Sequence, residues 1–524
     1  MTPFVGEKKY RKRKIFFYLL LFVFLVFLHV SLYPYAYDDA YIHFRVARNF
    51  VETGFPYYNP GEILKVSTSS GWVLVLSLIE FVLQKIHLQD SLPVVISIFN
   101  ASVTFIGAII YGEVINSSIG HAISFNKKVL FYLLFIALML PPSIGLMETP
   151  LAILLIGLGI WLILQKKPAG LFFISLSIYF RLELIGPALI LLIYLLFTRQ
   201  LKWKDLIYPL IAIIPFISFD LAYYGTVVPH SMIAKSKVYE MGFINPINKI
   251  IFFSLPTNAF INNLVLNGIV LLSLILFTIW ISIKQYKISF PWVFIFLLWS
   301  LGIGGSYIIQ QVLVFEWYRP LYTIPLLIAS FILLELIPKS FMRMEYVLLS
   351  CVFGLSLFST TLACFHHYDY FESFALSARV KTYLKVGKVL NTAYPEAFLL
   401  SSEIGGLGYA FNGKILDAAG LASSDALLFH PMAVPAQREN GMIGAIPPEY
   451  VRFKKPELIV SYDFFMEALF NDNILLEYQM VSIPAFLPED APYSASKTIF
   501  GSKFLRVFVR KDLPLSDELL NLSY

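Results

Sequence analysis

Apolar runs long enough to cross a lipid bilayer recur from the N-terminus to about residue 365, and this pattern limits the fold more than any other feature. A helix crosses the hydrocarbon core with about 20 apolar residues, and the first such run extends from Ile15 to Leu32. Hydrophobic residues make up 58% of the 524-residue chain and charged residues 14%, with a mean hydropathy of +0.72. Because soluble globular domains are much richer in charge, the sequence predicts a mainly α, polytopic transmembrane helical bundle.

The N-terminal residues 1–14 are strongly basic and set the predicted orientation. The run that follows is longer than the hydrophobic region of a signal peptide and has no small-residue cleavage site, so we predict an uncleaved helix with a cytoplasmic N-terminus. The run Trp72–Ile86 is short for a span and carries Glu80, so we expect an interfacial or half-inserted helix within a first external loop, 34–92. Every later basic cluster then lies on the cytoplasmic side of the cell (inner or plasma) membrane.

With this placement, the predicted spans after the first lie at 93–115, 129–143, 149–165, 168–180, 182–197, 206–224, 262–283, 290–314, 318–337 and 345–364, which gives about eleven transmembrane helices within residues 15–365. Basic clusters between spans report orientation, so the formal net charge of +6 predicts no nucleic-acid partner. The two cysteines, Cys351 and Cys364, are expected on opposite faces of one helix, which argues against a disulfide framework or a cysteine metal site.

From residue 366 onward, polar residues, Gly and Pro become more frequent and no run is long enough to span. Residues 366–524 are therefore predicted to form an extracytoplasmic α/β domain. Strands are expected at Ala397–Ser401, Leu458–Ser461 and Phe504–Val509, and helices at Phe374–Leu390 and Phe464–Leu469. The stretch Gly405–Tyr409 lacks the GxGxxG spacing and the following helix of a nucleotide loop, so we predict a tight structural turn there.

An acidic pair, Asp38 and Asp39, lies just outside the first span. The residues that follow fall on two helical stripes, with Asp38, Tyr41, Arg45, Arg48 and Glu52 on one and Ile42, Val46 and Phe50 on the other. This spacing predicts a short amphipathic helix on the membrane surface, with Arg45 and Arg48 by default on its solvated face. Helix capping explains one aspartate. The second needs a proton, a cation or a metal, because a like-charged neighbour makes its ionisation costly.

The stretch that begins with the acidic pair reads DDAYIHFRVARNFVETGFPYYNPGE and is followed by STSSGW. It resembles the first periplasmic loop of GT-C membrane glycosyltransferases, most closely the bacterial group that includes the mycobacterial terminal β-1,2-arabinofuranosyltransferase. That group's loop has DDAFI, then F/Y-R-x-A-x-N, a Gly, NPGE and T/S-x-x-x-W; where it usually has Gly-Tyr-Thr, this chain has Val66-Ser67-Thr68. The Gly405–Tyr409 segment similarly resembles the Gly-x-x-Gly-Tyr turn of the group's C-terminal α/β domain.

The resemblance implies a glycosyltransferase that takes a sugar, with a pentofuranose as first candidate, from a polyprenyl-phosphate donor. The acceptor would be a cell-envelope glycan or lipid at the extracytoplasmic face. Such a transfer needs a base for the acceptor hydroxyl and cations for the leaving phosphate. The predicted base of an inverting single displacement is Asp38 or Asp39. The predicted phosphate-binding residues are Arg181, Lys235, Arg319 and His230, and the predicted substrate-binding residues are Tyr41, Arg45, Glu148 and Tyr224.

Three of these residues lie in segments that are similar to motifs of the group. Arg181 lies in an R-x-E turn, Glu148 in GLMETP, which resembles G-L-E-T, and Lys235 in YYGTVVPHSMIAKS, which resembles YYG-x-x-x-P-x-x-x-x-A-K-S. Ordinary structural roles stay open, because an Arg at a helix end also fits an interfacial anchor and Glu148 also fits a helix N-terminus. An ion pair from Arg181 to Glu183 has poor geometry within a helix, where positions i and i+2 diverge.

Two other functions and one cofactor stay open. A transporter or flippase of lipid-linked glycans places charges near the bilayer midplane and usually has paired halves, whereas here the charges cluster at one face and no repeat is found. An O-antigen ligase or polymerase would concentrate Arg and His in a large late loop. No cofactor is predicted with certainty, and a divalent ion between Asp38 and Asp39 has no further His or carboxylate at ligand spacing to support it.

Overall fold

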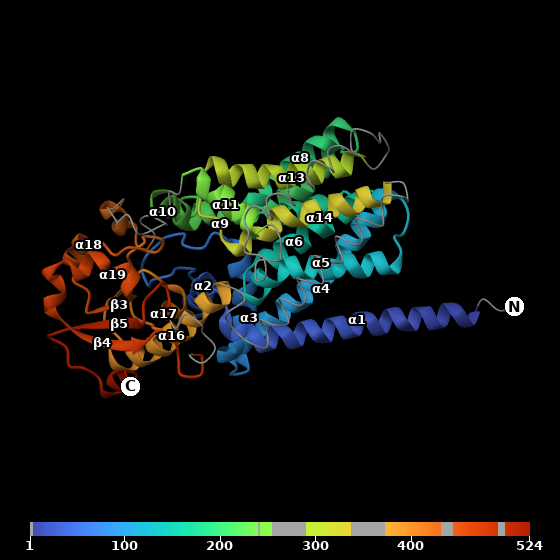
Figure 1. Cartoon of the computed structure of the whole chain (residues 1–524). Helices are drawn as coiled ribbons and strands as arrows, with labels where there is room; N and C mark the ends of the chain where they lie inside the picture. The colour runs from blue at the N-terminus through green and yellow to red at the C-terminus, as the bar shows by residue number, and fades with distance from the viewer. Residues whose placement is uncertain are drawn as a thin grey trace.

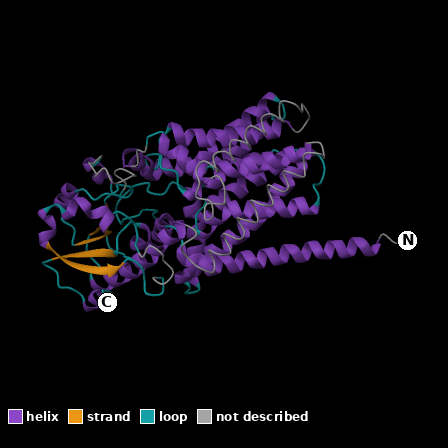
Figure 2. Cartoon of the chain, in the orientation of Figure 1, coloured by secondary structure: helices purple, strands orange, loops and turns teal. Residues whose placement is uncertain are grey.

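The structure is a computed structural model that describes residues 4–238, 242–253, 290–336, 372–430, 444–490 and 498–523. These residues are mainly helical, with a small sheet near the C-terminus (Figure 2). Within the described ranges, six helices are long and apolar enough to cross a membrane: Lys14–Tyr35, Gln89–Ile119, Phe125–Ile144, Trp203–Tyr224, Pro291–Ile309 and Glu316–Glu335. This arrangement fits a membrane protein.

The predicted count of about eleven spans is not confirmed. The predicted spans 149–165 and 182–197 correspond to the shorter apolar helices Thr149–Leu164 and Leu182–Phe197. The predicted spans 262–283 and 345–364, and both cysteines, lie outside the described residues.

Most of the described helices up to residue 336 form one bundle (Figure 1). Its long helices are α1 (Phe4–Leu32), α4 (Leu92–Ile119), α5 (Phe125–Ile144), α9 (Ile207–Tyr224), α13 (Phe290–Ile309) and α14 (Arg319–Leu336). Its shorter helices are α2 (Asp38–Thr53), α3 (Ser70–Lys85), α6 (Thr149–Leu164), α7 (Gly170–Ser177), α8 (Ile185–Phe197) and α11 (Ile244–Phe253). The short helix α10 (His230–Val238) packs against the C-terminal region. Helix α4 packs against α1, α5 and α6, and α13 packs against α14 and α8.

The predicted span at 168–180 is wrong, because α7 contains only eight residues there. At 1.5 Å per residue, such a helix is about 12 Å long, less than half the thickness of the hydrocarbon core. It packs closely on α6, where a Cβ atom at Gly170 would overlap the carbonyl oxygen of Gly159. The chain leaves the helix before Arg181, whose backbone is extended. Apolar composition alone could not show this break.

The two ends of the bundle differ in what they carry (Figure 1). At the end that holds the N-terminus, the Lys14 ammonium lies 5.6 Å from the ring of Phe125 at the start of α5. At the other end, the Tyr37 amide donates to the Gly145 carbonyl, at 3.2 Å, just after α5. The acidic pair and the chain before α6 therefore share the end of the bundle that faces the C-terminal sheet.

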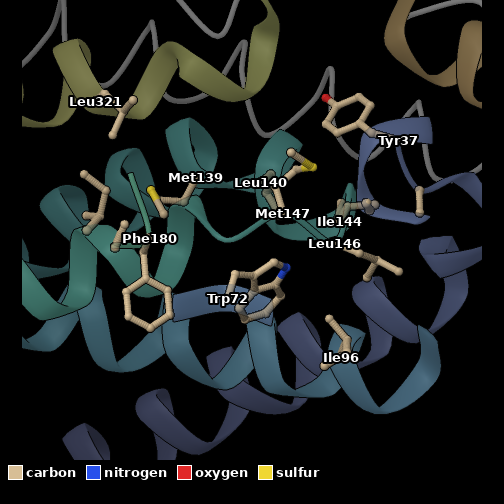
Figure 3. Close-up of a cluster of buried hydrophobic side chains, with 14 of the residues drawn as sticks. Tyr37, Trp72, Ile96, Met139, Leu140, Ile144, Leu146, Met147, Phe180 and Leu321 are labelled. Atoms are coloured by element: carbon tan, nitrogen blue, oxygen red, sulfur yellow. The ribbon is translucent and has the colours of Figure 1, made fainter. Parts of the chain in front are cut away.

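Helix α3 anchors the first loop through a buried apolar cluster (Figure 3). Trp72 on α3 is fully buried among Ile96 of α4, Met139 of α5 and Met147 after α5. The Gly71 amide also donates to the Tyr179 carbonyl, at 3.0 Å. With 16 residues, α3 is shorter than a span, as predicted. It fixes the loop against the segment that carries Arg181.

The C-terminal region contains a mixed sheet in the order β2-β1-β3-β5-β4 (Figures 1 and 2). Its strands are β1 (Leu399–Ser401), β2 (Ile415–Asp417), β3 (Leu458–Tyr462), β4 (Tyr478–Pro484) and β5 (Phe504–Arg510). Strand β1 pairs in parallel with β2 and β3, and β5 pairs in antiparallel register with β3 and β4. The three predicted strands and two predicted helices are confirmed, whereas β2 and β4 were not predicted.

Helices flank this sheet, and one of them corrects a prediction. They are α16 (Glu372–Ala393), α17 (Gly405–Ala410), α18 (Pro448–Lys454), α19 (Asp463–Phe470) and α20 (Asp517–Asn521). The tight turn predicted at Gly405–Tyr409 is wrong, because these residues begin α17. Helix α17 packs between α2 and α16, and this packing brings the C-terminal region onto the first loop.

Candidate active site

Helix α2 forms as predicted, but the first part of its polar stripe, Asp38, Tyr41 and Arg45, is buried rather than solvated. The Asp38 carboxylate is buried and accepts hydrogen bonds from the amides of Gly405 and Gly406, both at 2.8 Å. These amides begin α17, where the helix dipole favours a negative charge. Asp38 therefore caps a helix of the C-terminal region, and its side chain makes no capping bond to its own helix.

Arg45, two turns along the same stripe, is also used for docking. Its buried guanidinium donates to four backbone carbonyls, those of Tyr58, Gly408, Phe411 and Gly413. Arg48 donates to the Tyr409 carbonyl at 3.1 Å, and the Tyr41 ring lies 5.4 Å from the Tyr409 ring. The predicted substrate-binding residues Tyr41 and Arg45 thus contact the C-terminal region instead of a solvent-filled site.

The glycines of α17 permit this close docking. A Cβ atom at Gly405 would overlap the backbone of Asp38, and one at Gly408 would overlap the hydroxyl of Tyr58. Neither position has a positive φ, so the requirement is for space rather than for an unusual backbone conformation. The glycine motif noted in the sequence is therefore a packing surface for α2.

A second face of α2 carries Asp39 and His43 and points away from this joint. The Asp39 side chain is 31% exposed, and its Oδ2 lies 3.7 Å from the Nζ of Lys235 on α10. His43 is buried, with its Nδ1 2.9 Å from the Ser67 hydroxyl and its Nε2 3.9 Å from Glu148 Oε2. Asp39 and His43 are four residues apart, so they share a helix face.

Arg181 links this cluster to the segment between α7 and α8. Its guanidinium donates to Glu148 Oε1 at 2.7 Å and to Glu183 Oε1 at 2.5 Å. The pair with Glu183 forms because Arg181 has an extended backbone, with φ −146° and ψ 112°, and is followed by a 3₁₀ turn. The geometric objection to this pair held only for an α-helix. Arg181 is therefore neutralised on one side and lies 4.5 Å from the Tyr318 ring on another.

The charges of the cluster are set by its burial and its pairs. Burial acts to lower the pKa of Lys235, but the neighbouring Tyr318 and Asp39 outweigh it and hold the pKa above its ordinary value. Glu183 and Glu148 likewise outweigh burial and raise the pKa of Arg181. For His43, burial dominates and lowers the pKa, although Glu148 and Asp39 act against it. At neutral pH the site contains two fixed cations and a neutral imidazole.

An aromatic wall lies beside the two cations, formed by the end of α13 and the chain between α13 and α14. The Phe315 and Trp317 rings stack at 4.4 Å, and the Tyr307 and Tyr318 rings stack at 5.5 Å. Lys235 Nζ lies 5.5 Å from the Phe315 ring. Such a wall suits a sugar ring or an isoprenoid chain next to a charged group.

The remaining predicted residues lie in structural contacts. Arg319 is fully buried and donates to the carbonyls of Ala137 and Leu138 at 3.2 and 3.3 Å. The His230 Nε2 is 3.1 Å from the Gly420 carbonyl, which ties α10 to the C-terminal region. The Tyr224 hydroxyl donates to the Pro56 carbonyl at 2.7 Å.

The structure thus brings together four of the predicted residues, Asp39, Lys235, Arg181 and Glu148. Sequence reasoning missed His43, Ser67 and Glu183 as members of the cluster. His43 had a detectable signal, because it lies one helical turn after Asp39. Ser67 had none, because a loop residue distant in sequence has no periodicity to place it.

The cluster offers a partly exposed carboxylate, two cations and an aromatic wall at one end of the bundle. Such a set can accept a proton and stabilise a departing anion. Among the described residues, no group of three or more His, Cys, Asp or Glu side chains is arranged to hold a metal ion. The chain matches no family model, and a search of curated proteins finds no match.

Proposed function

We propose that this protein is an integral membrane glycosyltransferase of the GT-C type that transfers a sugar from a polyprenyl phosphate to a cell-envelope glycan or lipid. A pentofuranose is the first candidate for the sugar. The observation that carries the proposal is the Asp39 carboxylate, partly exposed and 3.7 Å from Lys235 Nζ, beside the Arg181 ion-pair network. A base and an anion site then lie within one cluster, as a displacement from a phosphate requires.

Asp39 acts as the general base in a single displacement with inversion. Its carboxylate takes the proton of the acceptor hydroxyl while the acceptor oxygen bonds to the anomeric carbon of the sugar. The bond from that carbon to the phosphate oxygen breaks, and its electron pair stays on the polyprenyl phosphate. The choice between the two aspartates follows from access, because Asp38 is 8% exposed and its oxygens accept two amides.

Lys235 and Arg181 stabilise the phosphate as it departs. The Lys235 ammonium is on the short helix α10 and faces Asp39 at a distance longer than a hydrogen bond, so it can turn to an incoming phosphate oxygen. Arg181 already has two carboxylate partners, so it is not an unpaired cation. Its guanidinium orients the phosphate and adds to the positive electrostatic potential of the site. The Tyr318 ring beside it offers a surface for the sugar.

The donor is expected at the extracytoplasmic face, where nucleotide sugars are absent. The basic N-terminus and the acidic pair lie at opposite ends of the bundle, which supports this orientation. Cysteines introduced at the exposed positions Glu52 and Lys167, in a chain without the native cysteines, test it. An impermeant maleimide added to intact cells should label Glu52→Cys, and Lys167→Cys only after permeabilisation. The reverse pattern would remove the proposed donor.

The direct test incubates the purified full chain with synthetic polyprenyl-phosphate pentofuranoses, pentopyranoses and hexoses, together with glycan and lipid acceptors. Transfer from one donor class supports the proposal, whereas movement of the lipid across vesicles without transfer indicates a flippase. Lys235→Ala should weaken transfer by at least about tenfold, because a charge-assisted contact contributes roughly 1.5–3 kcal/mol. Lys237→Ala, on the exposed face of the same helix, is the matched control and should leave transfer unchanged.

A further inference from the structure

Behind Asp39, a row of polar side chains extends through four segments of the protein. Ser67 of the first loop contacts His43 on α2, His43 faces Glu148 before α6, and Glu148 pairs with Arg181. All four residues are buried. Nothing in the reaction outlined above uses Ser67 or His43, although burying polar side chains costs free energy that their hydrogen bonds must offset.

The neighbours of His43 on both sides favour one tautomer of its imidazole. The Ser67 hydroxyl oxygen accepts from the Ser69 amide at 3.1 Å, and in the arrangement inferred here its hydrogen donates to His43 Nδ1 at 2.9 Å. The proton of a neutral imidazole is then on Nε2. This nitrogen faces Glu148 Oε2 at 3.9 Å, which is longer than a hydrogen bond. The oxygen is buried and has no hydrogen-bond partner among the described residues. Because a carboxylate oxygen can only accept, the Nε2–H tautomer is the one that complements Glu148.

We propose that His43 is a positioning residue of the transfer site, held by Ser67 as the neutral Nε2–H tautomer so that it donates toward Glu148 and leaves the other carboxylate oxygen to orient Arg181. This inference rests on the proposed sugar transfer for its effect on rate. The arrangement itself does not depend on transfer. His43 sets the direction in which the Arg181 guanidinium faces a departing phosphate, although it touches neither substrate.

The proposal predicts a characteristic pH dependence. The charged groups around His43 are Asp39 on its own helix, Glu148 before α6, Arg181 before α8 and Lys235 on α10. Protonated His43 would be a second cation on Glu148 and would compete with Arg181 for it. Because burial lowers the pKa of His43, this competition begins only below its ordinary value of 6.5. Transfer should therefore have an acid limb that depends on Ser67.

The test uses the full chain labelled with ¹⁵N-histidine in lipid nanodiscs, and assigns His43 by the signals that disappear in His43→Gln. At pH 7.5 we expect the ¹⁵N shifts of a neutral imidazole protonated on Nε2. Ser67→Ala should mix the tautomers, lower the transfer rate on the order of tenfold by misplacing Arg181, and shift the acid limb. Ser67→Thr keeps the hydroxyl and should restore both readouts. His121→Gln, at an exposed histidine, is the matched control.

The outcomes separate this inference from the proposed function. An Nδ1–H tautomer or an imidazolium at pH 7.5 would overturn the role of His43 whatever the activity. An unchanged rate and unchanged pH profile in a correctly folded Ser67→Ala would do the same. If the tautomer is as expected but no donor is consumed by the native chain, the function assigned to the site fails while the arrangement of Ser67 and His43 stands.

Discussion

The two faces of α2 carry adjacent aspartates with opposite surroundings. On the docked face, Asp38 and Arg45 are buried and bonded to backbone groups of the C-terminal region. On the site face, Asp39 is partly exposed and its Oδ2 lies 3.7 Å from Lys235 Nζ. A buried charge that loses its partner costs several kcal/mol, whereas an exposed ion pair contributes at most about 1 kcal/mol. The polar contacts of the docked face therefore join α2 to the C-terminal region, whereas the carboxylate of the site face is available for chemistry.

This difference changes how a deletion of residues 366–524 should be interpreted. The C-terminal region supplies the partners of Asp38 and Arg45, and its Gly420 carbonyl contacts His230 at the start of α10. It thereby holds both helices that carry Asp39 and Lys235. Truncation would expose unpaired buried charges and displace the site, so point substitutions at the joint are the more informative experiments.

Gly405→Ala should have the largest effect on the docked face of α2. The added methyl group overlaps the backbone of Asp38, which cannot move aside as a flexible side chain would. We expect a loss of at least about 3 kcal/mol in docking free energy. Hydrogen exchange of the α17 amides measures it directly. Gly186→Ala, where nothing lies within 4 Å of the new atom, is the control and should leave these amides protected. Protected amides in Gly405→Ala would contradict the close packing.

The free energy of unfolding should depend on pH through the ionisation of Asp38. Burial and the neighbouring Glu403 raise its pKa from 3.8 to about 7, against the opposing effect of Arg379 and the two amides. Between these values the folded state binds the proton more tightly than the unfolded state, so this group makes stability fall as pH rises from about 4 to about 7. The loss is up to about 4 kcal/mol at about 1.4 kcal/mol per pH unit.

Denaturant titrations of the native chain and Asp38→Asn in detergent, at several pH values, test this sign. The native chain should lose stability across the window relative to Asp38→Asn, which has no proton to release at that position. Parallel curves for the two proteins would show that Asp38 does not titrate abnormally.

Arg45→Ala should cost about 3 kcal/mol of folding free energy, because four carbonyls lose a charged donor. Denaturant titration in detergent provides the measurement. Arg45→Lys keeps the charge but not the planar fork, so it should recover only part of the loss. A neutral effect of Arg45→Ala would mean that solvent replaces the guanidinium and that the joint is looser than described.

Arg48→Ala should have the smallest effect, about 1–2 kcal/mol. It removes one hydrogen bond to the Tyr409 carbonyl and a contact of the guanidinium 3.8 Å above the Tyr409 ring. The same titration measures it, and sugar transfer per folded molecule should stay at the native value. A large loss of transfer would place Arg48 in the site and erase the distinction between the two faces.

Much of the fold could be predicted because periodicity and apolar length are local properties of the sequence. The helix at Asp38–Thr53, the long helices and three of the five strands follow from them. Strand β2 was missed because three residues between turns carry no repeat. Helix α17 was mistaken for a turn because its glycines, poor helix formers, are there for space next to α2.

The candidate site was predictable only in part, for a physical reason. Spacing placed Asp38, Tyr41, Arg45 and Arg48 on one stripe, but it could not show that a segment more than 300 residues later would cover that stripe. Asp39 is distinguished from Asp38 by a rotation of about 100° around the helix. Which of these two directions faces the domain and which faces the site is decided by tertiary contacts.

The central claim is that the two aspartates have different tasks, and one measurement addresses it directly. The rate of sugar transfer per folded molecule is compared for Asp39→Asn and Asp38→Asn with a common polyprenyl-phosphate donor. We predict that Asp39→Asn loses roughly 10²–10⁴-fold in rate, as expected for a general base, while donor binding persists and Asp38→Asn transfers at nearly the native rate. Full activity of Asp39→Asn together with an inactive, folded Asp38→Asn would contradict the account.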